Sequence, residues 1–130
     1  MNSTADLGIL YEEWTTQEWM RFIRQIPEGT SIEKMKMLDD AFNFSKRGNS
    51  EIMAEWYIQS IKNGYDGINE PMEAFLIEVG RRKFLQPIYT ELAKTPENLE
   101  LAKNIYAKAR PNYHAISFNT IDEILGWEGH

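Results

Sequence analysis

Hydrophobic residues recur with a helical period along nearly the whole chain. Trp19, Phe22, Ile23 and Ile26, for example, fall at i, i+3, i+4 and i+7, a spacing that places apolar side chains on one face of an α-helix. No segment shows a convincing alternation of apolar and polar residues with β-branched enrichment, which is the pattern of a half-buried strand. The pattern therefore predicts an all-α protein.

Capping and helix-breaking residues divide this pattern into about seven short helices. Thr15 with Glu18 forms a capping-box signature before the first helix, and Thr30 with Glu33 repeats it before the second. The later helices are expected near residues 50–63, 71–79, 84–94, 96–110 and 116–125. Gly80 is expected to close the fourth of these seven helices. Pro87 is tolerable only in a first turn, so the fifth should begin near Lys83 or Phe84.

The turns between the expected helices are only two to six residues long, which makes consecutive helices antiparallel neighbours. A string of such pairs without long heptad repeats favours a right-handed α–α superhelix, a solenoid of antiparallel helix pairs. Because no strict repeat period is present, a plain helical bundle stays open. The length of 130 residues and the absence of a linker predict one helical domain over residues 1–130.

The charge and hydropathy of the chain limit the kinds of partner that it is expected to bind. The formal net charge of −6 argues against a general nucleic-acid binder, which needs a basic face. No apolar run approaches the ~20 residues that span a bilayer, and the first residues lack the pattern of a signal peptide. The chain has no cysteine. We therefore expect a cytoplasmic protein that binds neither nucleic acid nor membrane.

The residues that usually carry catalysis are sparse. The two histidines, His114 and His130, are far apart in sequence, and no H-E-x-x-H segment is present. We therefore expect neither a metal site nor a catalytic residue in this chain. The adjacent carboxylates Asp39 and Asp40 are interpreted as solvated surface, as are Glu12 and Glu13.

Two further interpretations are structural rather than functional. His114, just before the last expected helix, is assigned a capping or packing role. The aromatic residues that fit the helix stripes are assigned to the core: Trp14, Trp19, Trp56 and Tyr57.

A basic triplet, Arg81, Arg82 and Lys83, directly follows Gly80 and precedes a new helix. These cations could offset the negative end of the preceding helix. They could instead await an anion, because the following helix offers free N–H groups and a partial positive charge. The residues alone leave these two readings open in equal measure.

Two segments resemble the C-terminal domain of leukotriene A4 hydrolase and the related aminopeptidase B-type zinc aminopeptidases. They are NSEIMAEWYIQSI at 49–61 and GRRKFLQPIYTELAK at 80–94. The matching positions are Asn49, Ser50, Glu51, Ile52 and Trp56, then Gly80, Arg81, Lys83, Phe84, Pro87 and Tyr89. The segments TTQEWMRFI and PNYHAI show a weaker likeness to the same family, so the resemblance covers the chain from about Trp14 to Leu125.

The resemblance implies an α–α superhelix that packs beside a zinc peptidase domain and helps to wall its active-site cleft. It also implies that Arg81 and Lys83 bind the free carboxylate of a short peptide substrate. The zinc and its ligands would belong to a catalytic domain that is not in this chain, so the chain alone should be inactive. Gln86 and Ala115 stand where the family commonly has arginine and proline, and Arg82 is an extra charge, so subsite preference should differ.

A second hypothesis comes from another functional class. A solenoid of helix pairs could be a stand-alone interaction module whose concave face binds a protein or an acidic peptide. An H-E-x-x-H segment upstream in the same reading frame would favour the aminopeptidase hypothesis over this one.

Overall fold

The computed structural model describes residues 15–46 and 48–127. The chain divides into two compact units, one up to Ile68 and the other from Asn69 onward. The expectation of one domain over residues 1–130 stays a prediction.

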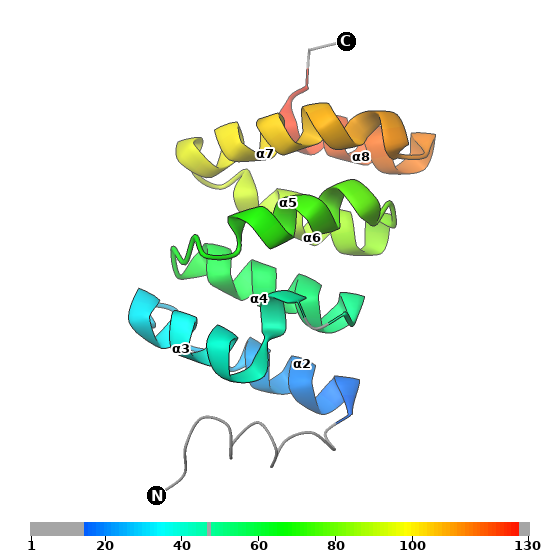
Figure 1. The fold of residues 1–130 in the computed structure, drawn as a ribbon. Helices are drawn as coiled ribbons and strands as arrows, with labels where there is room; N and C mark the ends of the chain where they lie inside the picture. The colour runs from blue at the N-terminus through cyan, green and yellow to red at the C-terminus, as the bar shows by residue number, and fades with distance from the viewer. Residues whose placement is uncertain (1–14, 47, 128–130) are drawn as a thin grey trace, which may run out of the picture. The chain divides into compact units, whose positions relative to one another are not determined.

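The expected all-α class is confirmed: the described residues form seven α-helices and two short 3-10 helices, with no strand among them (Figure 1). The superhelical stacking of the helix pairs stays a prediction. In the first unit the elements are α2 (Thr16–Arg24), α3 (Ile32–Phe42), η1 (Phe44–Lys46) and α4 (Ser50–Lys62). In the second they are α5 (Asn69–Glu78), α6 (Arg82–Leu92), α7 (Pro96–Ala109), η2 (Arg110–Asn112) and α8 (Ala115–Leu125).

Side-chain caps explain where several helices begin. The capping box before α2 is confirmed, since the Glu18 N–H donates to Thr15 Oγ1 at 3.2 Å and the Thr15 N–H donates to Glu18 Oε1 at 3.1 Å. The prediction of Thr30 as the next cap was wrong, because Ser31 caps α3. The Thr30 hydroxyl instead donates to the Pro27 carbonyl at 2.6 Å and stabilises the preceding turn.

Aromatic side chains fill the core of the first unit, where α2 lies beside α4. Trp19, Trp56 and Tyr57 are buried, which confirms their assignment to the core; Trp14 lies outside the described residues. The Phe44 ring from η1 lies between the two tryptophans, with centroid distances of 5.4 Å to Trp19 and 4.9 Å to Trp56. These tilted and edge-on contacts are the favoured geometry for aromatic rings.

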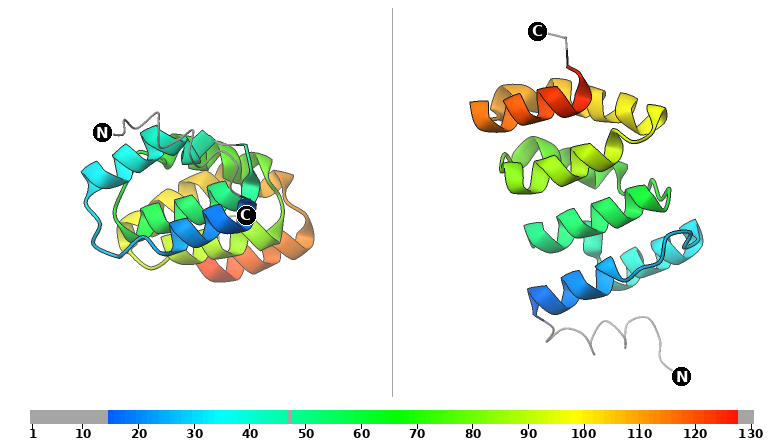
Figure 2. Two further views of the ribbon diagram at one scale, coloured as in Figure 1. Left: turned by 90° about the horizontal axis from the view of Figure 1, so that it is seen from below. Right: turned by 180° about the vertical axis from the view of Figure 1, so that it is seen from behind.

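The helices of the second unit form two layers, which Figure 2 separates clearly. Helices α5 and α7 pack together in one layer, and α6 and α8 pack together in the other. The core between the layers is fully buried and mostly aliphatic, with Leu76, Leu85, Ile88, Leu92, Ile105 and Ile121. Helix α6 thus packs its buried face against α8.

Two expectations near the start of α6 were wrong in detail. Helix α6 begins at Arg82, so Pro87 lies in its second turn and cannot donate to the Lys83 carbonyl. Helix α5 ends at Glu78, before Gly80, and Gly80 does not adopt the left-handed conformation of a typical helix stop. The segment Val79–Arg81 is therefore a short turn between α5 and α6, called the α5–α6 turn below.

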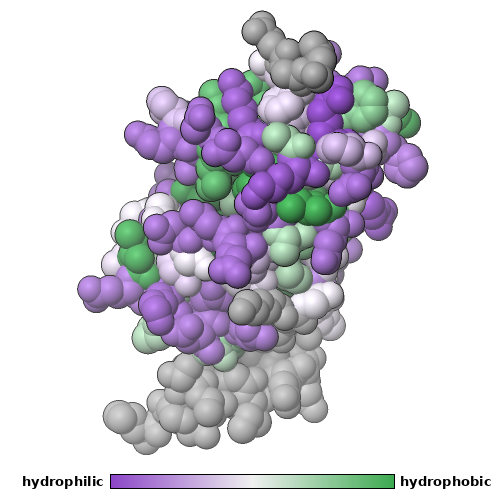
Figure 3. Space-filling model, turned by 45° about the horizontal axis from the view of Figure 1, so that its top comes forward, coloured by the Kyte–Doolittle hydropathy of each residue, from purple (hydrophilic) through white to green (hydrophobic). Residues whose placement is uncertain are grey.

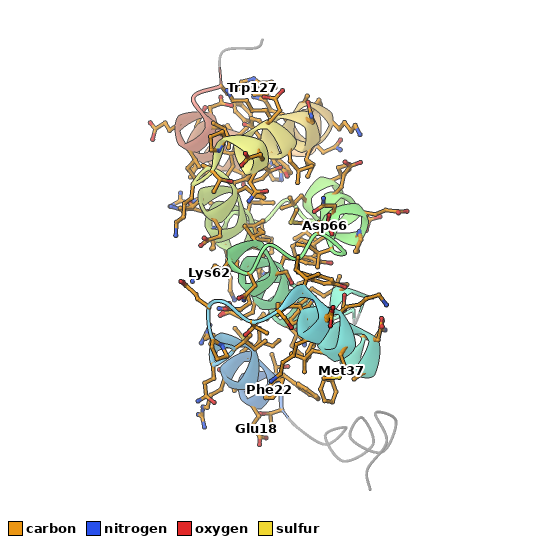
Figure 4. The ribbon with its side chains drawn as sticks, turned by 90° about the vertical axis from the view of Figure 1, so that its left-hand side faces the viewer. Glu18, Phe22, Met37, Lys62, Asp66 and Trp127 are labelled. Atoms are coloured by element: carbon orange, nitrogen blue, oxygen red, sulfur yellow. The ribbon has the colours of Figure 1, made fainter. Side chains whose placement is uncertain are left out.

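Charged and polar residues predominate on the face shown in Figure 3, and apolar residues form small separate patches. Large exposed apolar side chains among the described residues are Ile32 and Met37 on α3 and Ile116 on α8 (Met37 is labelled in Figure 4). Such scattered residues are normal on a soluble surface and indicate no interface by themselves. No helix in residues 15–46 or 48–127 combines the length and apolar character that a bilayer span requires.

Candidate functional site

The predicted site residues lie where the α5–α6 turn meets α6. Arg81 is the residue that precedes α6, while Arg82 and Lys83 form its first turn. All three side chains are exposed. Exposure matters here because a cation buried against an internal carboxylate could not receive a ligand.

Arg81 and Lys83 lie beside the same aromatic ring. The Arg81 guanidinium carbon is 5.8 Å from the centroid of the Phe84 ring, and Lys83 Nζ is 5.3 Å from it. Such cation–π contacts contribute ~0.5–1 kcal/mol at exposed sites. No comparable ring contact of Arg82 occurs among the described residues. Among the three cations of the triplet, the structure therefore places Arg81 and Lys83, and not Arg82, beside the Phe84 ring.

The electrostatics at the start of α6 favour an anion. Arg81 occupies the N-cap position with no side-chain hydrogen bond to the helix, whereas Thr95 caps the next helix in the usual way. The first turn of α6 contains no acidic residue. Cations beside the partial positive end of a helix repel it unless a negative group intervenes.

Residues around the start of α8 hold the α5–α6 turn in place. The Ser117 hydroxyl donates to the Gly80 carbonyl at 3.0 Å, and the Tyr113 hydroxyl donates to the carbonyl of Leu76 in the last turn of α5. Burial raises the pKa of Tyr113 to about 12, so the phenol is a neutral donor at physiological pH. The turn that carries the cations is thus anchored on both sides by one short segment.

His114, which lies between these two anchoring residues, does not fill its expected role. It occupies the N-cap position of α8, but its exposed side chain makes no capping hydrogen bond. The expected capping or packing role of its imidazole was therefore wrong. The hydrogen bonds that matter here come from the residues on either side of it.

In the first unit the Asn49–Ile61 motif has an internal structural explanation. The Asn49 side chain caps α4 by accepting from the N–H groups of Glu51 and Ile52, at 3.0 and 3.1 Å. Trp56 Nε1 donates to Ser45 Oγ at 3.2 Å, and the Tyr57 hydroxyl donates to the Ser45 carbonyl at 2.7 Å. The motif therefore fixes η1 against α4, and its side chains need no ligand to account for them.

Asp39 anchors the same cluster, which corrects its assignment to the solvated surface. Its carboxylate accepts from the Ser45 N–H at 2.9 Å, from Ser45 Oγ at 2.6 Å and from the Tyr65 hydroxyl at 3.2 Å. The pKa of Tyr65 is raised to about 12, mainly by burial and to a smaller extent by the negative charge of Asp39. Asp40 is exposed and pairs with Lys36 at 3.0 Å, as expected of a surface residue.

In a third polar cluster, which lies in the second unit, the polar side chains form hydrogen bonds with one another. Arg110 donates two parallel hydrogen bonds to Asp122, at 3.0 and 2.9 Å, and the Tyr106 hydroxyl donates to the same carboxylate at 2.5 Å. The pKa of Tyr106 is raised, mainly by burial and to a smaller extent by the hydrogen bond to Asp122. Trp127, which follows α8 (Figure 4), packs edge-on against the Tyr106 ring with 5.0 Å between centroids. The carboxylate is saturated by its neighbours, so the cluster joins η2 to α8.

A sequence profile of the family described as "Leukotriene A4 hydrolase, C-terminal" matches residues 14–125. The chain belongs to this family. The match contains both motifs and the segment that anchors the α5–α6 turn, so the turn, its cations and its anchors all lie inside the family's domain.

Individual relatives agree with the profile. The chain is 30% identical over 95 residues to leucine aminopeptidase 2 of Ajellomyces capsulatus, covering 73% of this chain and 15% of that protein. It is 28% identical over 116 residues to leucine aminopeptidase 2 of Neurospora crassa (87% and 17%). It is 27% identical over 86 residues to leukotriene A-4 hydrolase of Xenopus laevis (66% and 14%). The chain thus spans about one sixth of the length of the curated relatives that it matches.

Two residues of this leukotriene A4 hydrolase C-terminal domain were missed from the sequence as part of the site. Tyr113 lies in the PNYHAI segment, which was noted only as a weak likeness to the family, and Ser117 directly follows that segment. Their polar groups were the available signal, since a tyrosine and a serine at the entry of a helix can make specific hydrogen bonds. Nothing local indicated that their acceptors lie 37 residues away.

Proposed function

We propose that this chain is the C-terminal domain of a zinc aminopeptidase, that it helps to wall the active-site cleft, and that Arg81 and Lys83 anchor the C-terminal carboxylate of a peptide substrate. One observation carries the proposal. Two exposed cations lie beside one ring at the start of α6, where no side chain caps the helix.

The chemistry of the two residues suits a carboxylate. A guanidinium can donate two parallel hydrogen bonds to the two oxygens of a carboxylate, and an ammonium adds a compact positive charge. The partial positive end of α6 adds to the same attraction. A peptide amide offers no negative charge, so the site should distinguish a free peptide C-terminus from an amidated one.

The cleavage chemistry would come from the rest of the longer protein. No group of three or more potential ligand side chains among the described residues is placed to hold a metal ion. Zinc would therefore be bound by the catalytic domain, where it would activate water for attack on the N-terminal peptide bond. The chain alone would be inactive. A cytoplasmic location completes the proposal, since the chain has no cysteine to form a disulfide.

The decisive test compares two arginines that are adjacent in sequence. In the aminopeptidase that carries this domain, kcat/KM is measured for a tripeptide and for its C-terminal amide. Arg81→Ala should lower kcat/KM for the free tripeptide by roughly 10- to 150-fold, which corresponds to losing a ~1.5–3 kcal/mol charged hydrogen bond. The amide should be affected much less. Arg82→Ala is the matched control, because it removes the same charge from an exposed side chain that is not at the Phe84 ring.

Two results would contradict the proposal. Equal losses on the free and amidated tripeptides after Arg81→Ala would mean that the residue does not bind the carboxylate. Equal effects of Arg81→Ala and Arg82→Ala on the free tripeptide would mean that general positive charge, rather than the geometry at Phe84, attracts the substrate.

A further inference from the structure

The α5–α6 turn is held at its two ends by the flanking helices, because the Val79 N–H donates to the Phe75 carbonyl and the Arg81 carbonyl accepts from Phe84 and Leu85. It has three residues between two helices, and the middle one is Gly80. Gly80 has no positive φ, and a Cβ added to it would meet only ordinary contacts, 3.9 Å from Tyr113 Cδ1 and 4.0 Å from the Asn112 carbonyl. Neither strain nor lack of space therefore demands glycine here. A glycine in such a place leaves the turn many accessible conformations.

Hydrogen bonds from outside the turn supply the missing restraint. Ser117 is 5% exposed and its hydroxyl donates to the Gly80 carbonyl. On the other side, the Tyr113 hydroxyl donates to the Leu76 carbonyl, one of the C-terminal carbonyls of α5 that lacks a helical partner. Tyr113 has a single hydroxyl hydrogen, so the Tyr89 hydroxyl, 3.1 Å away, is the donor to Tyr113.

The bond from Ser117 acts directly on the backbone of Arg81. The Gly80 carbonyl and the Arg81 nitrogen belong to one planar peptide unit. A hydrogen bond that orients this carbonyl also orients the bond from which the Arg81 side chain departs. The same peptide plane leads into the first turn of α6 and hence to Lys83.

We propose that Ser117 is a positioning residue for Arg81 and Lys83, holding the Gly80–Arg81 peptide so that both cations face one carboxylate. This inference rests on the proposed function of the two cations. Ser117 does not touch the substrate. Its contribution is to keep the turn in the conformation that places the guanidinium and the ammonium at the Phe84 ring.

The experiment measures the selectivity ratio, defined as kcat/KM for a free tripeptide divided by kcat/KM for its amide, in the full-length aminopeptidase. Ser117→Ala should lower this ratio by about three- to tenfold, the range expected for the loss of one neutral hydrogen bond. Ser117→Thr keeps the hydroxyl and should restore the ratio. A merely structural role would reduce the amount of folded enzyme and lower both rates together, leaving the ratio unchanged.

Ser60→Ala provides a matched control. Ser60 is also a fully buried helical serine, but its hydroxyl has no hydrogen-bond partner among the described residues. Its replacement should leave the selectivity ratio unchanged. If Ser117→Ala fails to fold, Tyr113→Phe tests the same restraint from the other side of the turn and should lower the ratio in the same direction.

The outcomes separate the two proposals. If Arg81→Ala lowers the selectivity ratio and the Ser117 and Tyr113 variants do not, the positioning role is wrong while the carboxylate site stands. If Arg81→Ala leaves the ratio unchanged, the carboxylate site fails and the positioning role fails with it. A lowered ratio after Ser117→Ala that Ser117→Thr does not restore would also overturn the inference, because the effect would not come from the hydroxyl.

Discussion

Asp39→Ala is expected to destabilise the first unit far more than the same change at the adjacent, exposed Asp40. The substitution removes one carboxylate that accepts three hydrogen bonds, two from Ser45 and one from Tyr65. It leaves the Ser45 N–H and the Tyr65 hydroxyl without their acceptor. Ser45 also accepts hydrogen bonds from Trp56 Nε1 and from the Tyr57 hydroxyl. A displacement of Ser45 would therefore loosen the contact between η1 and α4.

The size of the effect follows from these contacts. A hydrogen bond to a charged group contributes ~1.5–3 kcal/mol when it is shielded from water. Asp39 is half-buried, so water can replace part of the lost interaction. We expect Asp39→Ala to lower the free energy of unfolding by ~2–4 kcal/mol. Asp39→Asn keeps one acceptor oxygen and should cost about half as much.

Urea unfolding followed by tryptophan fluorescence measures this change, because Trp19 and Trp56 belong to the core of the first unit. Asp40→Ala is the control, since Asp40 is adjacent in sequence and pairs with Lys36 only on the exposed surface. Such an exposed pair contributes at most ~0.5 kcal/mol. Equal losses for Asp39→Ala and Asp40→Ala would refute the reasoning, because the three part-buried hydrogen bonds of Asp39 would then contribute nothing measurable.

Two further predictions concern the second unit and the tyrosines. Thr95→Ala removes the side chain that accepts from the Asn98 N–H at 3.3 Å at the start of α7 and should cost ~1 kcal/mol, measured by urea unfolding followed by circular dichroism. The pKa values of Tyr65 and Tyr113 are both raised to about 12, above the ordinary value of 10. The unfolded chain therefore loses these protons first, and the free energy of unfolding should fall as the pH rises from about 10 to 12. Tyr113→Phe should weaken that fall, and an unchanged pH dependence in this variant would contradict the assignment.

The helices could be predicted because the information that determines them is local. The capping box before α2 involves two residues three positions apart, so both halves are visible in one short window. The start of α3 was harder, because Thr30 and Ser31 are adjacent residues that can both cap a helix. The choice depends on a competing acceptor, the Pro27 carbonyl, which engages the Thr30 hydroxyl in a turn.

The different environments of Asp39 and Asp40 could not be predicted in this way. Both are acidic residues near the end of α3. The helical period places Asp39 on the same face as the buried Met35 and Phe42, but it indicates no polar partner for a carboxylate there. The difference arises beyond the helix, where Asn43 adopts the left-handed conformation with φ of 55°. That turn brings the chain back so that Ser45 meets the Asp39 carboxylate.

The candidate site shows the same limit. Arg81, Lys83 and Phe84 are nearly consecutive, so their proximity could be inferred from the chain itself. The hydroxyl groups that hold the preceding backbone, at Leu76 and Gly80, come from residues 37 positions further along the chain. Periodicity and capping rules describe contacts within one turn of helix, and they contain no information about which carbonyl a distant hydroxyl will meet.

The two family motifs therefore have different physical roles. In the Asn49–Ile61 motif the polar side chains Asn49, Trp56 and Tyr57 donate to or accept from neighbours inside the first unit. In the Gly80–Lys94 motif the cations Arg81 and Lys83 stand exposed at a helix start that opposes positive charge. Substitutions at Trp56 or Tyr57 should therefore lower stability, because they disrupt buried hydrogen bonds. The Arg81 side chain gains a cation–π contact at Phe84 but opposes the partial positive end of α6, and the two effects are similar in size. Removing Arg81 should therefore leave stability nearly unchanged while substrate selectivity falls.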